Sequence, residues 1–290
     1  MSQPLIDSIA TGLILHYQHC NTNRVHLSMM IIRRVVRDIL AALNYLQALN
    51  VQHRDLKPRN IAVNCEGKAV LLNFGRVNII DDTVMNDNIV QTAPYRAPEV
   101  TLQCNCLCNN SAVLWSLGCI LYEMLTWQRL FSSYNGVSLE PAKMLSVQSF
   151  EDLISAQMRR CGPIPESFLA KIGSDSDRMC LKKRFSGTSD SANLKELLTE
   201  RSKVANLTDP QDATVLDFVE ACMKFDPAER ITIEEALNHP FIGDIYSPED
   251  LSHVVPLTDA TDFKREMDEW RQIIYKEIQN LKARANTPMP

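Results

Sequence analysis

The stretch "VQHRDLKPRN", residues 51–60, decides the fold because a helical pattern leads into it and a strand pattern leads out of it. Before it, apolar residues recur at helical spacing across residues 28–48, and Ser28 stands at the position of an N-cap. After it, the β-rich runs "NIAVN" and "KAVLLNF" flank the turn sequence "CEGK", which predicts a small hairpin. The polar stretch is therefore predicted to be a loop between a helix and a hairpin. The apolar positions of the helix are Ile32, Val35, Val36, Ile39, Leu43 and Leu46.

The rest of the chain has the patterns of helices and loops, so the expected fold class is mainly α with one short hairpin. The run "SAVLWSLGCILYEML", residues 111–125, is apolar all round, which is typical of a buried central helix. Residues 132–150 and 172–192 contain Ser and Gly and are predicted to be surface insertions. Further helices are predicted over 212–225, over 232–242, where Thr232 opens a capping box, and over 266–281.

Composition and charge exclude several classes of protein. Of the 290 residues, 45% are hydrophobic and 22% are charged, which are ordinary globular values. The net charge of −5 gives no basic surface for nucleic acid, and no apolar run approaches the roughly 18 residues of a membrane span. Nine cysteines, behind an N-terminus without a secretory signal pattern, indicate reduced thiols and a cytoplasmic or nuclear location. The spacing of Cys104, Cys106 and Cys108 favours a cysteine-rich loop over a metal site.

Three residues of the loop carry groups that phosphoryl transfer requires. That reaction needs a group that orients the attacking hydroxyl, cations that neutralise the phosphates, and ligands that hold the metal. The string "HRDLKPRN" fits H-R-D-L-x-x-x-N in full, and with it the chain resembles the eukaryotic protein kinases. The resemblance implies that Asp55 accepts the hydroxyl proton, that Lys57 reaches the γ-phosphate, and that Asn60 faces the metal. It also implies ATP and magnesium as cofactors.

Other residues of the resemblance are implied to be structural. The string "YRAPEV", residues 95–100, resembles the segment that closes a kinase activation loop, and this implies that Glu99 pairs with a buried arginine, Arg230. Thr92 stands where kinases place the hydroxyl that bridges the catalytic acid and the lysine. The remaining residues of this kind are His53, Arg54 and Phe74.

Within the protein kinases, the chain is most similar to the MAP kinases, and among these to the stress-activated branch. The strings that carry this similarity are "HRDLKPRNIAVN", "APYRAPEV" and "MDEWRQIIYKEI". The resemblance implies a truncated kinase domain over 1–242, with hinge region and large lobe, and a MAP-kinase-like extension over 243–290. MAP kinases bind basic docking peptides at an acidic site, and the candidates here are Asp244, Glu249 and Asp250. A solvated acidic loop is the alternative interpretation.

Two departures from the kinase pattern affect ATP and metal. Only 52 residues precede His53, and they contain no G-x-G-x-x-G run, no V-A-I-K string and no lysine. We therefore expect the small β lobe to be largely missing, together with the residues that grip the phosphates of ATP. Asn73 replaces the aspartate of D-F-G, and its amide oxygen brings no charge to a magnesium ion. The metal pair Asn60 and Asn73 is thus degenerate, and ATP and magnesium are expected to bind weakly or not at all.

Two further departures affect the framework and its regulation. Val113 replaces the aspartate that opens the central helix of kinases and that accepts hydrogen bonds from the backbone around H-R-D. In the activation loop, the triplet 87–89, "DNI", replaces the Thr-x-Tyr that MAP kinases phosphorylate. Residues 93–94, Ala-Pro, replace the basic and aromatic residues that shape the substrate pocket.

The resulting hypothesis is a pseudokinase of the MAP kinase family that acts as a binding or scaffold module for proteins of a kinase cascade. Most kinase catalysis is electrostatic stabilisation of phosphate charge, and this chain has lost several of the groups that supply it. The first alternative is an active serine/threonine kinase whose small lobe is supplied elsewhere. The second alternative is a truncated gene product.

Overall fold

The computed structural model describes residues 28–63, 67–79, 90–102, 111–131, 133–134, 137–138, 147–172, 175–185, 194, 196–198 and 211–247. Several predicted features lie outside these residues: the helix over 266–281, the three clustered cysteines, the triplet 87–89, and the acids Glu249 and Asp250. Within the described residues the fold is mainly α, as the sequence predicts.

The helix that leads into the catalytic loop is α2 (Met29–Ala48), and it begins where the sequence predicts. The Oγ atom of Ser28 accepts a hydrogen bond from the backbone N of Ile31 at 3.4 Å, which satisfies one of the free donors of the first turn. The helix ends at Ala48 with Leu49 as its C-cap, and the next residue, Asn50, has a φ of 57° in the left-handed region that asparagine tolerates. Leu46, also predicted, is partly buried and packs against the core. The other predicted apolar residues are buried: Ile32, Val35, Val36, Ile39 and Leu43.

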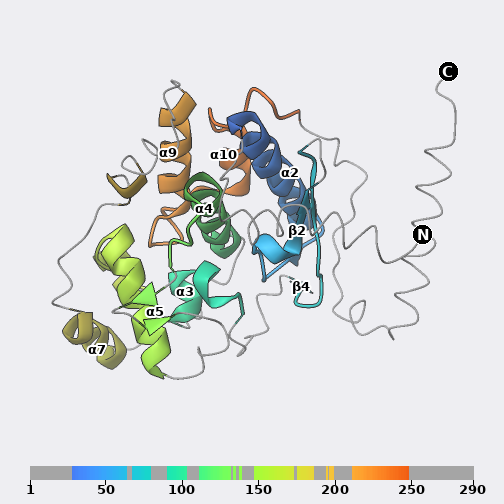
Figure 1. Ribbon diagram of the computed structural model, residues 1–290. Coiled ribbons are helices and arrows are strands. Elements are labelled where there is room, and N and C mark those ends of the chain that lie inside the picture. The colour runs from blue at the N-terminus through green and yellow to red at the C-terminus, as the bar shows by residue number, and fades with distance from the viewer. Residues whose placement is uncertain are drawn as a thin grey trace, which may run out of the picture.

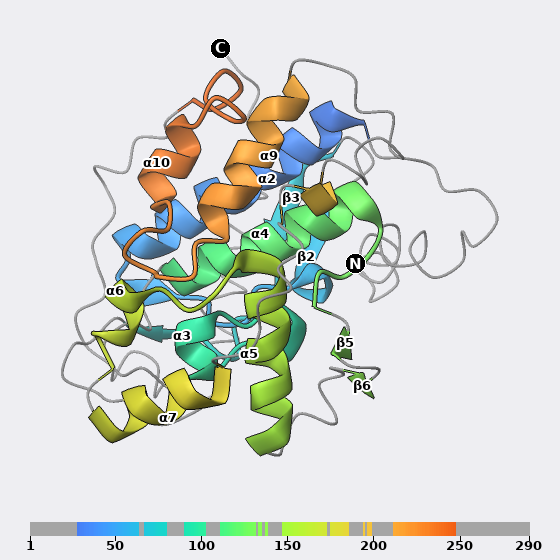
Figure 2. The same cartoon turned by 90° about the vertical axis from the view of Figure 1, so that its left-hand side faces the viewer.

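The central helix is α4 (Ser111–Thr126), and it is buried on nearly every side, as its apolar sequence predicts. It lies between α2 and α9 (Gln211–Cys222), while α10 (Ile233–Asn238) packs on α2 (Figures 1 and 2). Close approach to α9 depends on Gly118, because an added Cβ would lie 2.7 Å from Sδ of Met223. Thr232 caps α10 in the predicted capping box with Glu235.

The described strands form short antiparallel pairs, two of which flank the catalytic loop. The predicted hairpin is β2 (Ile61–Val63) with β3 (Ala69–Leu71), paired in the register Ile61↔Leu71. A second pair, β1 (Val51–Gln52) with β4 (Asn78–Ile79), is not predicted by the sequence, because two-residue strands carry no alternation to detect. A third pair is β5 (Ser133–Tyr134) with β6 (Val137–Ser138). Between β1 and β2 the short 3-10 turn η1 (Pro58–Asn60) completes the loop.

The prediction of loop insertions is partly wrong. Residues from 147 onward form α5 (Val147–Cys161), and residues predicted as a second insertion form α7 (Asp175–Phe185). The side chains Leu153, Ile154 and Met158 of α5 are buried, so its core contacts support a helix that starts within a Ser-containing stretch. Helix α7 packs Leu181 and Phe185 against a second hydrophobic cluster, while its Met179 is 71% exposed, so its sequence has no continuous apolar stripe to detect.

The remaining elements are short: η2 (Ala93–Tyr95), α3 (Pro98–Thr101) and α6 (Glu166–Leu169). Two of them, α3 and α6, are labelled in Figure 2. A small second hydrophobic cluster joins α5 and α6 to Phe225. Among the described residues, no helix combines the length and the apolar character needed to cross a membrane.

Candidate catalytic site

The predicted catalytic acid, Asp55, lies in a closed triangle of hydrogen bonds. Its Oδ1 accepts from Oγ1 of Thr92 at 2.7 Å, and its Oδ2 accepts from Nζ of Lys57 at 2.7 Å. Nζ of Lys57 also donates to Oγ1 of Thr92 at 2.8 Å. Asp55 is only 2% exposed, so these contacts fix the orientation of a carboxylate that water barely reaches. The three side chains therefore have the arrangement that the resemblance implies, and their catalytic roles stay predictions.

The predicted metal-facing amide, Asn60, is held from two sides. Its Nδ2 donates to the backbone O of Asp55 at 2.6 Å, and its own backbone O accepts from the backbone N of Leu72 at 2.8 Å. Its Oδ1, the atom implied to face a metal, accepts from Nδ2 of Asn73 at 3.2 Å. The two amides implied to share the metal thus bond to each other.

Asn60 and Asn73 fit a magnesium ion poorly, because neither side chain carries a negative charge. Asn73 is exposed, with a φ of 65° that asparagine tolerates better than most residues, and it turns an N–H donor toward Asn60. Magnesium sites in phosphoryl-transfer enzymes use carboxylates together with the phosphates of the substrate. Amide oxygens from positions 60 and 73 would bring the ion no negative charge. Among the residues that the structure describes here, the anionic side chain beside them is Asp55, which is already paired with Lys57.

The histidine of the motif bonds to the backbone on both of its ring nitrogens. His53 is 2% exposed, and its Nδ1 accepts from the backbone N of Asp55 at 3.3 Å. Nε2 must then carry the proton, which it donates to the backbone O of Leu72 at 3.0 Å. Burial lowers the pKa of His53 below its ordinary value, the bond to Leu72 opposing that shift, so the neutral ring is favoured. The histidine thus ties the catalytic loop to the end of β3.

Phe74 contacts this histidine without being buried. Its ring lies edge-on to the His53 ring with a centroid separation of 5.4 Å, and 47% of its surface is exposed. Phe74 therefore touches the catalytic loop while nearly half of its surface stays accessible to solvent. The neighbouring Arg54 has a φ of 57°, and its Nε donates to the backbone O of Arg76 at 2.8 Å. Arg54 thus connects the catalytic loop to the segment that follows "NFG".

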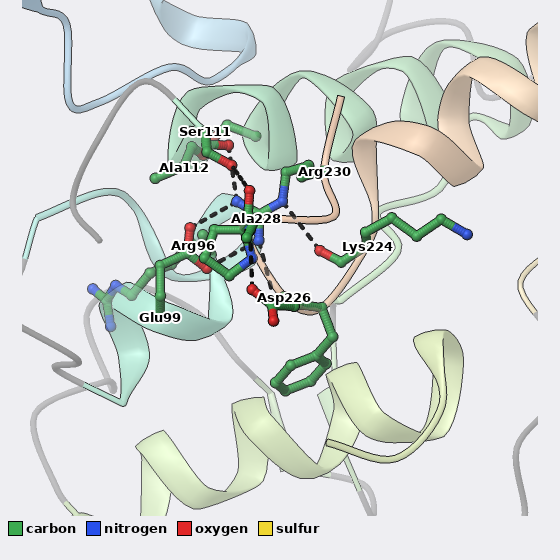
Figure 3. Close-up of polar contacts among 12 residues, drawn as sticks. Arg96, Glu99, Ser111, Ala112, Lys224, Asp226, Ala228 and Arg230 are labelled. Carbon is green, nitrogen blue, oxygen red and sulfur yellow. Dashed lines mark hydrogen bonds and ion pairs between the residues drawn. The ribbon is translucent and has the colours of Figure 1, made fainter. Parts of the chain in front are cut away.

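The implied ion pair between Glu99 and Arg230 is present and fully buried (Figure 3). Nη1 of Arg230 donates to Oε1 of Glu99 at 2.7 Å and Nη2 donates to Oε2 at 3.0 Å, a bidentate arrangement. The guanidinium also donates to the backbone O of Ser111 and of Lys224, and it lies 5.3 Å from the centroid of the Trp115 ring. The pair therefore joins α3, the start of α4 and the loop before α10.

The position of the missing helix acid, Val113, lies against a small cavity. The cavity measures about 30 Å³ and is lined by Val113 together with His53, Arg54 and Gln91 among others. Sequence reasoning missed Gln91, because a single glutamine in a polar stretch carries no pattern. The structure buries it to 3% exposure between the catalytic loop and α4.

The predicted docking acids are only partly described. Asp244 lies after α10, is 60% exposed, and forms an ion pair with Nη2 of Arg33, whose side chain is 3% exposed. Nε of Arg33 also donates to the backbone O of Phe241 at 2.7 Å. Asp244 therefore already has an internal partner on α2, and its role toward docking peptides stays a prediction.

The sequence of the chain is similar to that of known protein kinases. The family model described as "Protein kinase domain" matches residues 9–242, and the chain belongs to that family. It is 31% identical to Mitogen-activated protein kinase pmk-3 of Caenorhabditis elegans, over 89% of this chain and 50% of that protein. It is 30% identical to Mitogen-activated protein kinase p38a of Drosophila melanogaster, over 93% of this chain and 67% of that protein. It is also 30% identical to human Mitogen-activated protein kinase 12, over 87% of this chain and 61% of that protein.

Within the family, the chain is therefore a serine/threonine MAP kinase homologue of the p38 type, as its motifs predicted. It spans between 50% and 67% of the lengths of these three relatives. The prediction that the small lobe is largely missing is not confirmed, because the family match begins at residue 9, ahead of the described residues.

Proposed function

We propose that this chain is a MAP kinase homologue that transfers phosphate poorly or not at all and that serves as a protein-binding module. The observation that carries the proposal is the hydrogen bond from Asn73 to Oδ1 of Asn60. It occupies the implied metal-facing oxygen with an uncharged partner. A weakly bound or absent magnesium ion removes much of the electrostatic stabilisation on which phosphoryl transfer depends.

The N-terminal part of the chain supports the same proposal. Residues 1–52 contain no lysine and no glycine-rich run, so this chain brings neither of the usual grips on the phosphates of ATP. Without them the γ-phosphate would not be placed in line with a hydroxyl held by Asp55. Misplacement of that kind costs ~10²-fold or more in rate.

One observation favours the alternative of an active kinase whose small lobe lies outside this chain. The triangle of Asp55, Lys57 and Thr92 is complete and has short hydrogen bonds. A site with this geometry would need only ATP and metal held from elsewhere. The partners of either form would be cascade proteins and docking peptides, in the cytoplasm or the nucleus.

The test compares phosphotransfer and ligand binding by the wild type, by Asn73→Asp, and by Asn73→Asp combined with Asp55→Ala. We expect no magnesium-dependent thermal shift with micromolar ATP in the wild type, and no incorporation of labelled phosphate into a basic protein by any variant. Asn238→Asp is a matched control, because Asn238 is exposed on α10 and the change adds the same charge. Activity of the wild type would overturn the proposal. Activity in Asn73→Asp that disappears with Asp55→Ala would refute the argument from residues 1–52, because the chain would then hold ATP without a lysine or a glycine-rich run there.

A further inference from the structure

The buried glutamine Gln91 has an unusual backbone conformation. Its φ is 64°, in the left-handed region, and its side chain is 3% exposed. Non-glycine residues enter this region at a cost, so their surroundings must hold them there. The hydrogen bonds of its side chain and of its backbone hold Gln91 in this conformation.

The side chain of Gln91 bonds to two different elements. Its Nε2 donates to the backbone O of Ala112 at 2.9 Å and to Oγ of Ser116 at 3.1 Å, both on α4. Its Oε1 accepts from the backbone N of Ala97 at 2.9 Å, just before α3. Both N–H donors and the carbonyl are thus used, so the amide is locked against α4 and the segment leading to α3.

The backbone of Gln91 bonds to the catalytic loop. Its N–H donates to the backbone O of Arg54 at 3.1 Å. Arg54 is itself left-handed and directly precedes Asp55. A side chain anchored on α4 therefore controls, through its own backbone, the position of the residue before the predicted catalytic acid.

The cavity next to Val113 indicates why this contact matters. Val113 lies one residue after Ala112 on α4, and it lines the cavity with His53, Arg54 and Gln91. A valine side chain has no polar atom and gives the loop no hydrogen bond from α4. A cavity of about 30 Å³ has room for a small polar group.

We propose that Gln91 is a positioning residue that fixes the catalytic loop to the central helix. It lines the same cavity as Val113, whose apolar side chain cannot form that hydrogen-bonded link. Gln91 does so with a neutral amide, and the inference does not depend on whether the chain transfers phosphate. Removing the amide while keeping the side-chain volume frees the left-handed backbone at 91. The catalytic loop then loses its fixed bond at Arg54.

The experiment measures amide hydrogen exchange of residues 53–57 in the wild type and in Gln91→Met, with the amides of α4 as an internal reference. We expect exchange at 53–57 to rise about tenfold or more relative to α4, because a buried polar anchor is lost. Gln157→Met is the matched control. Gln157 is also buried, and its Nε2 donates to the backbone O of Arg96 at 2.8 Å. Arg96 in turn donates to the backbone O of Gln91 at 3.0 Å, so this control leaves the side-chain bonds of Gln91 to α4 in place.

A second variant tests the shared cavity. Val113→Asn, added to Gln91→Met, places a neutral amide beside the backbone of His53 and Arg54, and we expect it to restore most of the protection at 53–57. Unchanged exchange in Gln91→Met would overturn the proposal. So would an equal rise at 53–57 in Gln157→Met, or no recovery of protection when Val113→Asn is added.

Discussion

Replacing Glu99 by alanine tests whether the buried Glu99–Arg230 ion pair stabilises the fold, because the change leaves a buried arginine without its counter-ion. Both side chains of the Glu99–Arg230 pair have no exposed surface. After the change, Arg230 keeps its hydrogen bonds to the backbone O of Ser111, at 2.8 Å, and of Lys224, at 3.1 Å (Figure 3). Those carbonyls are dipoles, so the full positive charge stays buried and uncompensated.

The magnitude follows from that burial. Breaking a buried pair by removing one partner costs ~3–5 kcal/mol. Domains of this size class lose roughly 2–4 °C of melting temperature per kcal/mol, so Glu99→Ala should lower the midpoint by roughly 6–20 °C. Glu99→Gln keeps one acceptor oxygen and should fall between the wild type and the alanine variant. The assay is thermal unfolding followed by circular dichroism.

Two further variants make this test specific. Glu220→Ala removes an exposed ion pair with Lys224, at 3.4 Å, and should change stability by at most about 0.5 kcal/mol. Glu99→Leu combined with Arg230→Met removes both charges and should recover part of the loss, since no buried charge remains. A melting temperature of Glu99→Ala within a degree or two of the wild type would refute the reasoning, because a buried arginine would then tolerate the loss of its partner.

Two more predictions concern the histidine and the central glycine. Because burial lowers the pKa of His53, the unfolded chain binds a proton below about pH 6.5 that the folded chain does not, so His53 costs stability as the pH falls from 7.5 to 5.5. Urea midpoints at these two pH values should differ less in His53→Gln than in the wild type, and an unchanged difference would contradict the assignment of a neutral ring. Gly118→Ala should destabilise the fold by ~1–3 kcal/mol, since the new Cβ meets Sδ of Met223. Adding Met223→Ala should relieve part of that clash in urea unfolding, whereas simple additivity of the two changes would argue against it.

The sequence predicted best where a short contiguous pattern decides the structure. The apolar stripe of α2, the hairpin β2–β3 and the apolar run of α4 all carry strong local signals, and all three are present. Asp55, Lys57 and Asn60 come from one loop, so their proximity follows from the spacing alone. Patterns of this kind can be detected in a single sequence, because the residues that form them are close together along the chain.

Contacts between distant residues were predicted only where a family resemblance supplied them. Glu99 and Arg230 are 131 positions apart and were paired on that basis, whereas Arg33 and Asp244, 211 positions apart, were not. Gln91 was missed for the same reason, since its partners on α4 lie more than twenty positions away. Helix α7 was missed because the residues that pack it against the second cluster, Leu181 and Phe185, make too short a stripe for periodicity to detect.

The complete motif "HRDLKPRN" has a structural explanation that does not require catalysis. His53 donates to the backbone O of Leu72, and the backbone O of Asn60 accepts from the backbone N of the same residue. These bonds join the catalytic loop to the end of β3.

The acid of the motif is tied in the same way. Asp55 is bonded to Lys57 and Thr92, which joins the loop to the segment before η2. Removing any of these groups would leave a buried polar partner unsatisfied, at ~1–3 kcal/mol each. The motif therefore joins the hairpin and the segment before η2 to the catalytic loop whether or not phosphate is transferred. An intact loop is consistent with the proposed binding module, because that proposal rests on the missing charge at position 73 and on the lack of a lysine and a glycine-rich run in residues 1–52, and not on the geometry of the loop.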